Sequence, residues 1–238
     1  MNISAIITAH CEGLLAGPSL KSFSEATEAA RKAGLSVETI VVLDSPDQLT
    51  REIFEEHGAC GAQVLIFDGA DPGLSRNFGV SQAVGEHVAF LDADDLWSSN
   101  WLVKAHQFCT SEPGNLIAHS ELNLIFGDRR CWWWHADSQS PEFDPSYLRI
   151  KNYWDALIFS RREILIQFPY RKNDLKAGYG YEDWDWNCIT LGAGIPHRPV
   201  PGTVHMKRAR RGSQSALCDE NDVMTWPSEI QKYTWSLK

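Results

Sequence analysis

Short apolar runs alternate with helical segments through the first half of the chain, and this alternation constrains the fold more than any other feature. Strands are predicted at residues 3–8, 37–43, 63–67 and 87–91. Helices are predicted at about 19–33, in a segment ending near 57, and at about 74–84. Strands separated by helices are typical of a mostly parallel, Rossmann-like sheet with helices on both faces, so the predicted fold class is α/β.

The second half of the chain is less regular. Strands are predicted near 116–126, 130–135, 156–160 and 197–205, with a helix at about 182–191. A length of 238 residues suits one large domain, or one domain with a smaller appended region. We expect a single domain over 1–215, divided at about residue 96, and a C-terminal tail over 216–238 that is either a docking helix or loosely ordered.

The net charge and the cysteines limit which partners the protein can bind and which cell compartment it can occupy. The formal net charge of −9 argues against nucleic-acid binding, because a protein that grips a phosphate backbone needs excess positive charge. The six cysteines are scattered without a C-x-x-C pair, which favours reduced packing residues. Neither a signal peptide nor a membrane span is recognisable. We expect a cytoplasmic protein, with a peripheral membrane contact left open.

An acidic cluster, Asp92-Ala93-Asp94-Asp95, directly follows the strand predicted at 87–91. Ligands of open parallel sheets bind beyond the carboxyl ends of the strands, where this cluster falls. Two carboxylates one residue apart suit a hard cation such as Mg²⁺ or Mn²⁺. An EF-hand is excluded because Trp97 stands where the loop requires glycine. The alternative is that these acids only cap a helix beginning near Ser98.

The segments GLSRN at 73–77 and GEHVAFLDADD at 85–95 resemble the family 2 glycosyltransferases. His87 stands where that family usually has an aromatic residue, and the helix start is shortened. The first strand and the following His10-Cys11-Glu12 are similar to the family's opening segment. The resemblance implies a GT-A fold whose half at about 1–96 binds a nucleotide-sugar donor. The donor contacts that it implies are Thr8, His10, Glu12, Asp44, Arg76, Asn77, Asp92, Ala93 and Asp94.

The segment GYEDWDW at 180–186 resembles the acceptor motif of the same family, with Tyr181 inserted between the glycine and the glutamate. The resemblance implies that Asp183 is the catalytic base, with Glu182 as the second catalytic candidate, and that about 97–215 forms the acceptor side. An acid at a helix N-terminus is stabilised as the anion by free backbone amides and the helix dipole. The alternative is a helix that simply begins with favourable acids.

The basic segment KRARRGSQS at 207–215 follows His205. By resemblance, His205 completes the metal site of Asp92 and Asp94, and Arg208, Arg211 and Ser213 contact the donor's diphosphate. Cations near a departing diphosphate neutralise the charge that builds on it. The alternatives are a solvated basic face and a structural histidine.

Tryptophan is abundant, with ten residues in the chain. Trp132, Trp133 and Trp134 cannot all face one side of a strand, so at least one is expected to face solvent or a groove. Aromatic faces stack on sugar rings, and ordinary core packing is the alternative. The candidates for an acceptor platform are Trp133, Trp154, Trp184 and Trp186.

Together these features imply a metal-dependent, inverting glycosyltransferase. Its donor would be a UDP, GDP or dTDP sugar, its acceptor a carbohydrate or glycolipid hydroxyl, and its pathway bacterial-type polysaccharide or glycoconjugate synthesis. One alternative is a nucleotidyltransferase, although residues 9–13 lack the basic loop such enzymes use. Another is a non-catalytic carbohydrate-binding module, which would not need Asp92, Asp94 and Asp183 together.

Overall fold

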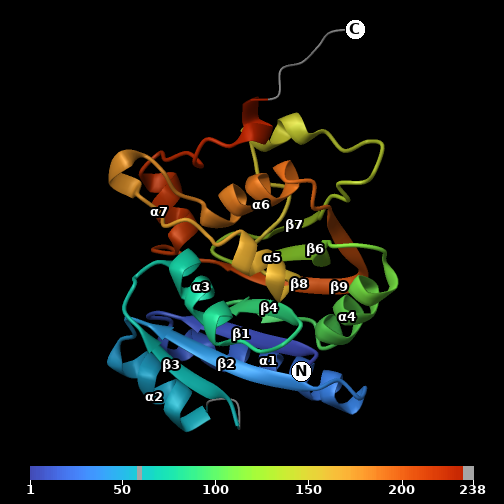
Figure 1. Ribbon diagram of the computed structural model, residues 1–238. Helices are drawn as coiled ribbons and strands as arrows, with labels where there is room; N and C mark the ends of the chain where they lie inside the picture. Colours follow the sequence, from blue (N-terminus) through green and yellow to red (C-terminus); the bar gives the residue numbers. More distant parts are fainter. Residues whose placement is uncertain (58–60, 233–238) are drawn as a thin grey trace, which may run out of the picture.

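The computed structural model describes residues 1–57 and 61–232. A single sheet runs through the molecule and helices pack on it (Figure 1). The strand order is β3-β2-β1-β4-β8-β6-β9-β5, and β7 pairs with β6 at the side of this path. The predicted α/β class is confirmed.

The first half of the chain forms the parallel part of the sheet. Its strands are β1 (Ile3–Ala9), β2 (Val37–Asp44), β3 (Gln63–Phe67) and β4 (His87–Asp92), and its helices are α1 (Ala16–Lys32), α2 (Gln48–His57) and α3 (Pro72–Gln82), with a 3-10 turn η1 (Gly13–Leu15) before α1. The strand β1 lies between β2 and β4 and is parallel to both. All four strands predicted in this half are present.

Alternate residues of β1 face two separate apolar clusters. Ile3 and Ile7 pack with α1, α2 and the later helix α4 (Trp101–Ser111), whereas Ile6 packs with α3. At the end of the strand Thr8 pairs with Asp92 of β4. The carboxyl ends of β1, β2 and β4 therefore meet at one edge of the sheet, which is where the acidic cluster lies.

The second half continues the sheet with mixed direction. Its elements are β5 (Leu96–Trp97), α4, β6 (Ile117–Gly127), β7 (Cys131–Trp134), β8 (Phe159–Arg161), α5 (Arg162–Gln167), α6 (Glu182–Gly192), β9 (His197–Ala209) and α7 (Gln214–Glu220), with 3-10 turns η2 (Pro145–Arg149), η3 (Leu175–Ala177) and η4 (Glu229–Lys232). The short β8 is antiparallel to β4 and β6, and β6 is parallel to β9. Neither β5 nor α5 was predicted.

Several boundaries differ from the sequence-based ones. Helix α1 begins at Ala16 rather than near 19, and β9 continues to Ala209, so that the first part of the basic segment is strand. Helix α7 crosses the boundary predicted between 215 and 216. The tail therefore begins inside a helix that packs on the domain.

The C-terminal tail is docked as far as it is described. The ring of Trp226 stacks on Tyr179 with centroids 4.0 Å apart, and its indole N–H donates to the Lys172 carbonyl at 3.3 Å. The end of the tail, 233–238, lies outside the described residues. No disulfide joins the cysteines of the described chain, and Cys60 falls outside it. No helix of that part is long and apolar enough to cross a membrane.

Candidate active site

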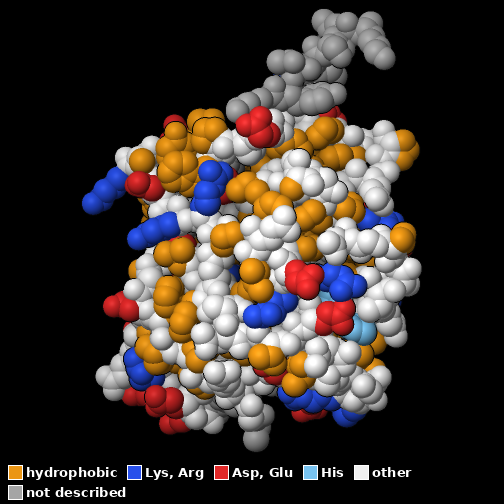
Figure 2. All heavy atoms as spheres, in the orientation of Figure 1, with side chains coloured by type: hydrophobic (Ala, Val, Ile, Leu, Met, Phe, Trp, Pro, Cys, Tyr) orange, Lys and Arg blue, Asp and Glu red, His pale blue; other side chains and the backbone are white. Residues whose placement is uncertain are grey.

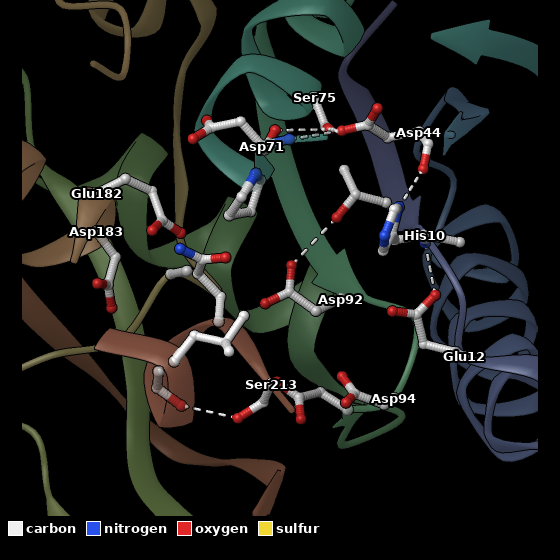
Figure 3. Close-up of a pocket in the computed structure, with 18 of the residues that line it drawn as sticks. His10, Glu12, Asp44, Asp71, Ser75, Asp92, Asp94, Glu182, Asp183 and Ser213 are labelled. Atoms are coloured by element: carbon white, nitrogen blue, oxygen red, sulfur yellow. Dashed lines mark hydrogen bonds between the residues drawn. The ribbon is translucent and has the colours of Figure 1, made fainter. Parts of the chain in front are cut away.

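One pocket of about 360 Å³ opens at the carboxyl ends of β1, β2 and β4. The N-terminus of α6, the end of β9 and helix α7 complete its wall, so the pocket combines both halves of the chain (Figure 3). Eight carboxylates line it: Glu12, Asp44, Asp71, Asp92, Asp94, Asp95, Glu182 and Asp183. Four cationic side chains also line it: Arg76, Lys207, Arg208 and Arg210.

Asp92 lies near the middle of the pocket (Figure 3). Its Oδ1 accepts hydrogen bonds from Thr8 Oγ1 at 3.1 Å and Arg76 Nη2 at 2.7 Å. Burial alone would raise the pKa of Asp92, but the cations of Arg76 and Lys207 more than offset burial and lower it. Asp92 is therefore held as an anion.

Arg76 joins the two halves of the pocket. It projects from α3, is only 1% exposed, and donates through Nη1 to Glu182 Oε1 of α6 at 2.9 Å as well as to Asp92. A buried guanidinium needs such partners, because an unpaired charge away from water is strongly destabilising. The ion pairs fix the start of α6 relative to β4.

Asp94 is held from the opposite wall. Arg210 Nε donates to Asp94 Oδ2 at 2.6 Å, and Arg210 Nη2 donates to Glu12 Oε1 at 3.3 Å. Arg208 Nε donates to the Asp94 carbonyl at 3.2 Å. Arg208 and Arg210 therefore lie against the turn formed by residues 92–95, which we call the acidic turn. Both are positioned to contact an anion bound there.

The acidic turn offers a hard divalent cation two carboxylate ligands, Asp92 and Asp94. Asp92 Oδ2 and Asp94 Oδ1 accept no hydrogen bond from the described residues, so one oxygen of each side chain remains for coordination. No group of three His, Cys, Asp or Glu side chains in the described chain could hold a metal. Mg²⁺ and Mn²⁺ sites commonly combine one or two carboxylates with phosphate oxygens and water, and this donor set fits that pattern.

Asp183 faces the pocket from the first turn of α6. Burial, and then the neighbouring carboxylate of Glu182, raise the pKa of Asp183 to about 6. The Trp184 N–H donates to Asp183 Oδ1 at 2.8 Å, and Asn152 Nδ2 donates to Oδ2 at 3.4 Å. The side chain is thus fixed in the pocket with a pKa close to neutral, as a general base requires.

Asp44 lines the pocket but is already saturated with hydrogen bonds. Its carboxylate accepts from the N–H groups of Gly69, Ala70 and Asp71 at 2.8–3.0 Å and from Ser75 Oγ at 2.6 Å. Burial would raise the pKa of Asp44, but these hydrogen bonds lower it. The side chain holds the loop between β3 and α3.

Most residues implied in donor binding or catalysis lie together in the pocket. They are Thr8, His10, Glu12, Asp44, Arg76, Asp92, Asp94, Glu182, Asp183, Arg208 and Ser213. Ser213 caps α7 by accepting from the Ala216 N–H at 3.3 Å. A hydrogen bond between the His10 ring Nδ1 and the Asp44 carbonyl, 2.6 Å long, fixes the position of the His10 side chain.

Three of the donor-site predictions fall outside the pocket lining. The side chain of Asn77 exchanges hydrogen bonds with the backbone of Tyr170. Ala93 is buried and donates its N–H to the Thr8 carbonyl. Arg211 is exposed, and its backbone N–H donates to Asp128. These residues support the pocket or its rim without lining it.

His205 is not brought to the acidic turn. It is fully buried, its Nδ1 lies 3.6 Å from Asp155 Oδ2, and its ring meets the edge of Trp101 at a centroid distance of 4.5 Å. The register of β9 places it between Trp97 and Asn123. We therefore do not retain His205 in the candidate metal site.

The four tryptophans proposed as acceptor platforms do not line the pocket either. Trp154 and Trp186 are 2% and 1% exposed, and their indole N–H groups donate to the carbonyls of Ala136 and Phe168. Trp184 is half-buried and donates to the Leu148 carbonyl. Trp133 packs edge-on against His135. Core packing therefore describes Trp154 and Trp186.

Sequence reasoning missed two cationic residues of the pocket, Lys207 and Arg210. Lys207 Nζ lies 3.6 Å from Asp95 Oδ2, and the N–H of Arg208 donates to Asp95 Oδ1 at 2.7 Å. Burial would lower the pKa of Lys207, but the carboxylates of Asp95 and Asp155 raise it overall. Lys207 therefore brings a permanent positive charge to the pocket.

The sequence model of the family described as glycosyl transferase family 2 matches residues 4–168. This match covers more than half of the chain and includes β1, α3, β4 and the acidic turn. The chain therefore belongs to glycosyl transferase family 2. No curated protein matches the sequence.

Several solved glycosyltransferases share the fold. TarS of S. aureus, residues 1–349, is 19% identical with a TM-score of 0.57, and the match covers 87% of this chain and 60% of that one. The mannosyltransferase PcManGT of Pyrobaculum calidifontis, solved with GDP-Man and Mn²⁺, is 15% identical with a TM-score of 0.61, over 90% of this chain and 59% of that one. Glucosyl-3-phosphoglycerate synthase of M. tuberculosis is 14% identical with a TM-score of 0.60, and the match covers 92% of this chain and 77% of that one. These likenesses show a GT-A fold, and the chain spans about 60% of TarS 1–349.

Proposed function

We propose that this chain transfers a sugar from a nucleotide-diphosphate sugar to an acceptor hydroxyl with inversion of configuration. The observation that carries the proposal is that Asp183, with a pKa of about 6, lines the same pocket as Asp92 and Asp94. A proton acceptor therefore shares one cavity with the donor-side acids, although 89 residues separate Asp183 from Asp94 (183 − 94). A carbohydrate-binding module would have no use for such a base.

In the proposed reaction, the carboxylate of Asp183 accepts the proton of the acceptor hydroxyl as its oxygen attacks the anomeric carbon. The bond from that carbon to the diphosphate oxygen breaks on the opposite face, and the nucleoside diphosphate leaves with the electron pair. A single displacement of this kind inverts the configuration. Arg208, Arg210 and Lys207 line the pocket and would neutralise charge on the leaving group.

Asp92 and Asp94 would hold Mn²⁺ or Mg²⁺, which when bound supplies positive charge next to the diphosphate. TarS is solved with UDP-GlcNAc and PcManGT with GDP-Man and Mn²⁺, which supports a nucleotide-sugar donor for this chain. We include UDP, GDP and dTDP as candidate nucleotides and a carbohydrate or glycolipid as acceptor. Polysaccharide or glycoconjugate synthesis in the cytoplasm is the proposed setting.

Nucleoside diphosphates should raise the melting temperature of the protein in the presence of Mn²⁺. A ligand at a hundred times its Kd stabilises the native state by about 2.7 kcal/mol, which for a chain of this size is a shift of about 5–10 °C. Asp94→Ala should remove the Mn²⁺-dependent part of the shift for the nucleotide that binds. A thermal-shift screen of UDP, GDP and dTDP, each with and without Mn²⁺, measures it.

The matched control is Glu163→Ala, which removes an exposed acid of α5 far from the pocket lining and should leave the shift unchanged. Equal Mn²⁺-dependent shifts in wild type and Asp94→Ala would show that the cation binds elsewhere.

The transfer rate should also depend on pH through Asp183. A general base acts only when deprotonated, so kcat/KM should fall about tenfold per pH unit below a pKa of about 6 and level off above it. Initial rates at a fixed donor concentration, measured over a range that brackets this pKa, test the prediction. A profile that stays flat through pH 6, or that falls as the pH rises, would exclude Asp183 as the base.

A further inference from the structure

A patch of apolar side chains is exposed on β6 and β7, outside the pocket described above. Trp132 and Trp134 are 63% and 59% exposed, and Leu124 is 37% exposed. Trp132 pairs with Leu124, which also pairs with Met206 of β9, and paired residues share one face of a sheet. We call this patch the tryptophan face: Leu122, Leu124, Phe126, Trp132, Trp134 and Met206.

The composition of the tryptophan face favours lipid over sugar. A carbohydrate site combines an aromatic platform with polar groups that fix the sugar hydroxyls. None of the six side chains of the face has a carboxylate, an amide or a hydroxyl. Its only polar atoms are the indole N–H groups of Trp132 and Trp134, and tryptophan with this combination of apolar body and polar tip is enriched where proteins meet the membrane interface.

Positive charge gathers at one end of the same face. Arg129 and Arg130 are exposed in the turn between β6 and β7, next to Asp128, whose N–H donates to the Ala209 carbonyl at 2.9 Å. Asp128 also accepts from the backbone N–H of the exposed Arg211 at 3.2 Å. These contacts bring the turn and the basic end of β9 together. On the face seen in Figure 2, by contrast, acidic and basic side chains are interspersed.

No ion pair with a described residue neutralises Arg129, Arg130 or Arg211. This basic end stands out in a chain whose formal net charge is −9. Uncompensated arginines beside exposed tryptophans are complementary to a surface that presents anionic headgroups over an apolar layer.

We propose that the tryptophan face and the arginines at its end dock the protein on the surface of an anionic lipid membrane. The docking does not depend on the transfer reaction, and the two can be tested separately. The face also borders the pocket, because the guanidinium of Arg208 lies 4.5 Å from the centre of the Phe126 ring and also lines the pocket. A docked protein would therefore hold the pocket beside the lipid surface.

Vesicle sedimentation tests the proposal. The intact protein should sediment with vesicles of phosphatidylcholine and phosphatidylglycerol in equal parts, and not with phosphatidylcholine alone. Raising the salt concentration should weaken the binding. Arg129→Gln with Arg130→Gln should weaken it about fivefold per arginine, the equivalent of about 1 kcal/mol each. Trp132→Ala with Trp134→Ala should reduce it to the level of phosphatidylcholine vesicles.

Two controls match these variants. Lys21→Gln with Lys32→Gln removes two exposed charges of α1, with side chains 79% and 81% exposed, and should leave binding unchanged. Ile150→Ala removes a 73% exposed apolar side chain elsewhere and should also leave binding unchanged. Thermal unfolding and the Mn²⁺-dependent nucleotide shift show whether each variant is folded and whether its pocket is intact.

Three results would overturn the proposal. The first is a wild type that does not sediment with anionic vesicles, or a double tryptophan variant that sediments as well as wild type. The second is quenching of tryptophan emission by soluble oligosaccharides without vesicle binding, which would assign the face to sugar. The third is a dimer seen by light scattering that the double tryptophan variant abolishes, which would assign it to a second copy of the chain.

Discussion

Replacing Asp183 with asparagine should lower kcat by about 100-fold to 10,000-fold, the usual contribution of a positioned general base. Asparagine has the shape of aspartate, and its amide oxygen can keep the hydrogen bond from the Trp184 N–H, so the pocket should stay folded; only the long 3.4 Å bond from Asn152 Nδ2 is lost. It cannot take a proton from the acceptor hydroxyl. Donor binding should be nearly unchanged, because the donor-side acids Asp92 and Asp94 lie at the end of β4 and in the turn after it, and not on α6. Steady-state transfer rates and nucleotide thermal shifts measure the two effects.

Asp185→Asn is the matched control for this experiment. Asp185 lies one half-turn further along α6, pairs with Arg171 and does not line the pocket. Its replacement should lower the melting temperature while kcat stays within a few-fold of wild type. A similar loss of kcat in both variants would mean that the start of α6 acts through its structure, and Asp183 would then lose its role as base.

Replacing Arg76 with methionine should lower the free energy of unfolding by about 3–5 kcal/mol, because the change leaves the buried Glu182 and the partly buried Asp92 without their ion-pair partner. For a chain of this size the melting temperature should fall by about 10 °C. Methionine keeps much of the arginine side-chain volume. The lost free energy of unfolding therefore measures the removal of the charge and not the creation of a cavity. Thermal unfolding followed by circular dichroism measures it.

Arg161→Met provides the comparison. Arg161 pairs with Glu86 at 2.7 Å, the same distance as Arg76 to Asp92, but both side chains are partly exposed, at 36% and 52%. An exposed ion pair contributes about 0–1 kcal/mol, so this variant should be close to wild type. Equal losses in the two variants would show that Arg76 does not hold the two halves of the pocket together.

The first half of the fold and the acidic turn could be predicted from sequence because their signals are local. Each strand from β1 to β4 is a short apolar run flanked by turn residues; Asp92 is the last residue of β4, and Asp94 follows it in the turn. Parallel strands bring their carboxyl ends to one edge, which places Thr8 and Asp92 at the same edge; their direct pairing comes from the adjacency of β1 and β4 in the structure.

The arginines of the pocket could not be chosen from sequence. Alternation along a strand does not select them, because the adjacent residues Lys207 and Arg208 both line the pocket. The structure brings Arg208 and Arg210 to the acidic turn and leaves Arg211 exposed. The strand was predicted to end at 205 and continues to Ala209, so Arg210 and Arg211 lie beyond it, where no strand periodicity sets the direction of their side chains.

The positions of His205 and the tryptophans could not be predicted, because they depend on packing between distant segments. His205 is buried by Trp101 and Asp155, which are 104 and 50 residues away in the sequence (205 − 101 and 205 − 155). Trp154 stacks on His197 with centroids 4.3 Å apart, and neither residue carries a local signal of that contact. Exposure of Trp132 and Trp134 agrees with the expectation that the three consecutive tryptophans cannot share one side.

Tyr181, the residue that precedes the two acids at the start of α6, connects α6 to α7. Its backbone is left-handed, with φ 58°, which costs a residue with a side chain on the order of 1–3 kcal/mol. Its hydroxyl donates to Asp219 of α7 at 2.5 Å, an exposed bond worth about 0.5–1.5 kcal/mol. Cys218 of α7 is fully buried, so α7 is held against the start of α6 by packing as well as by this hydrogen bond, and the wall that α7 gives the pocket depends on both.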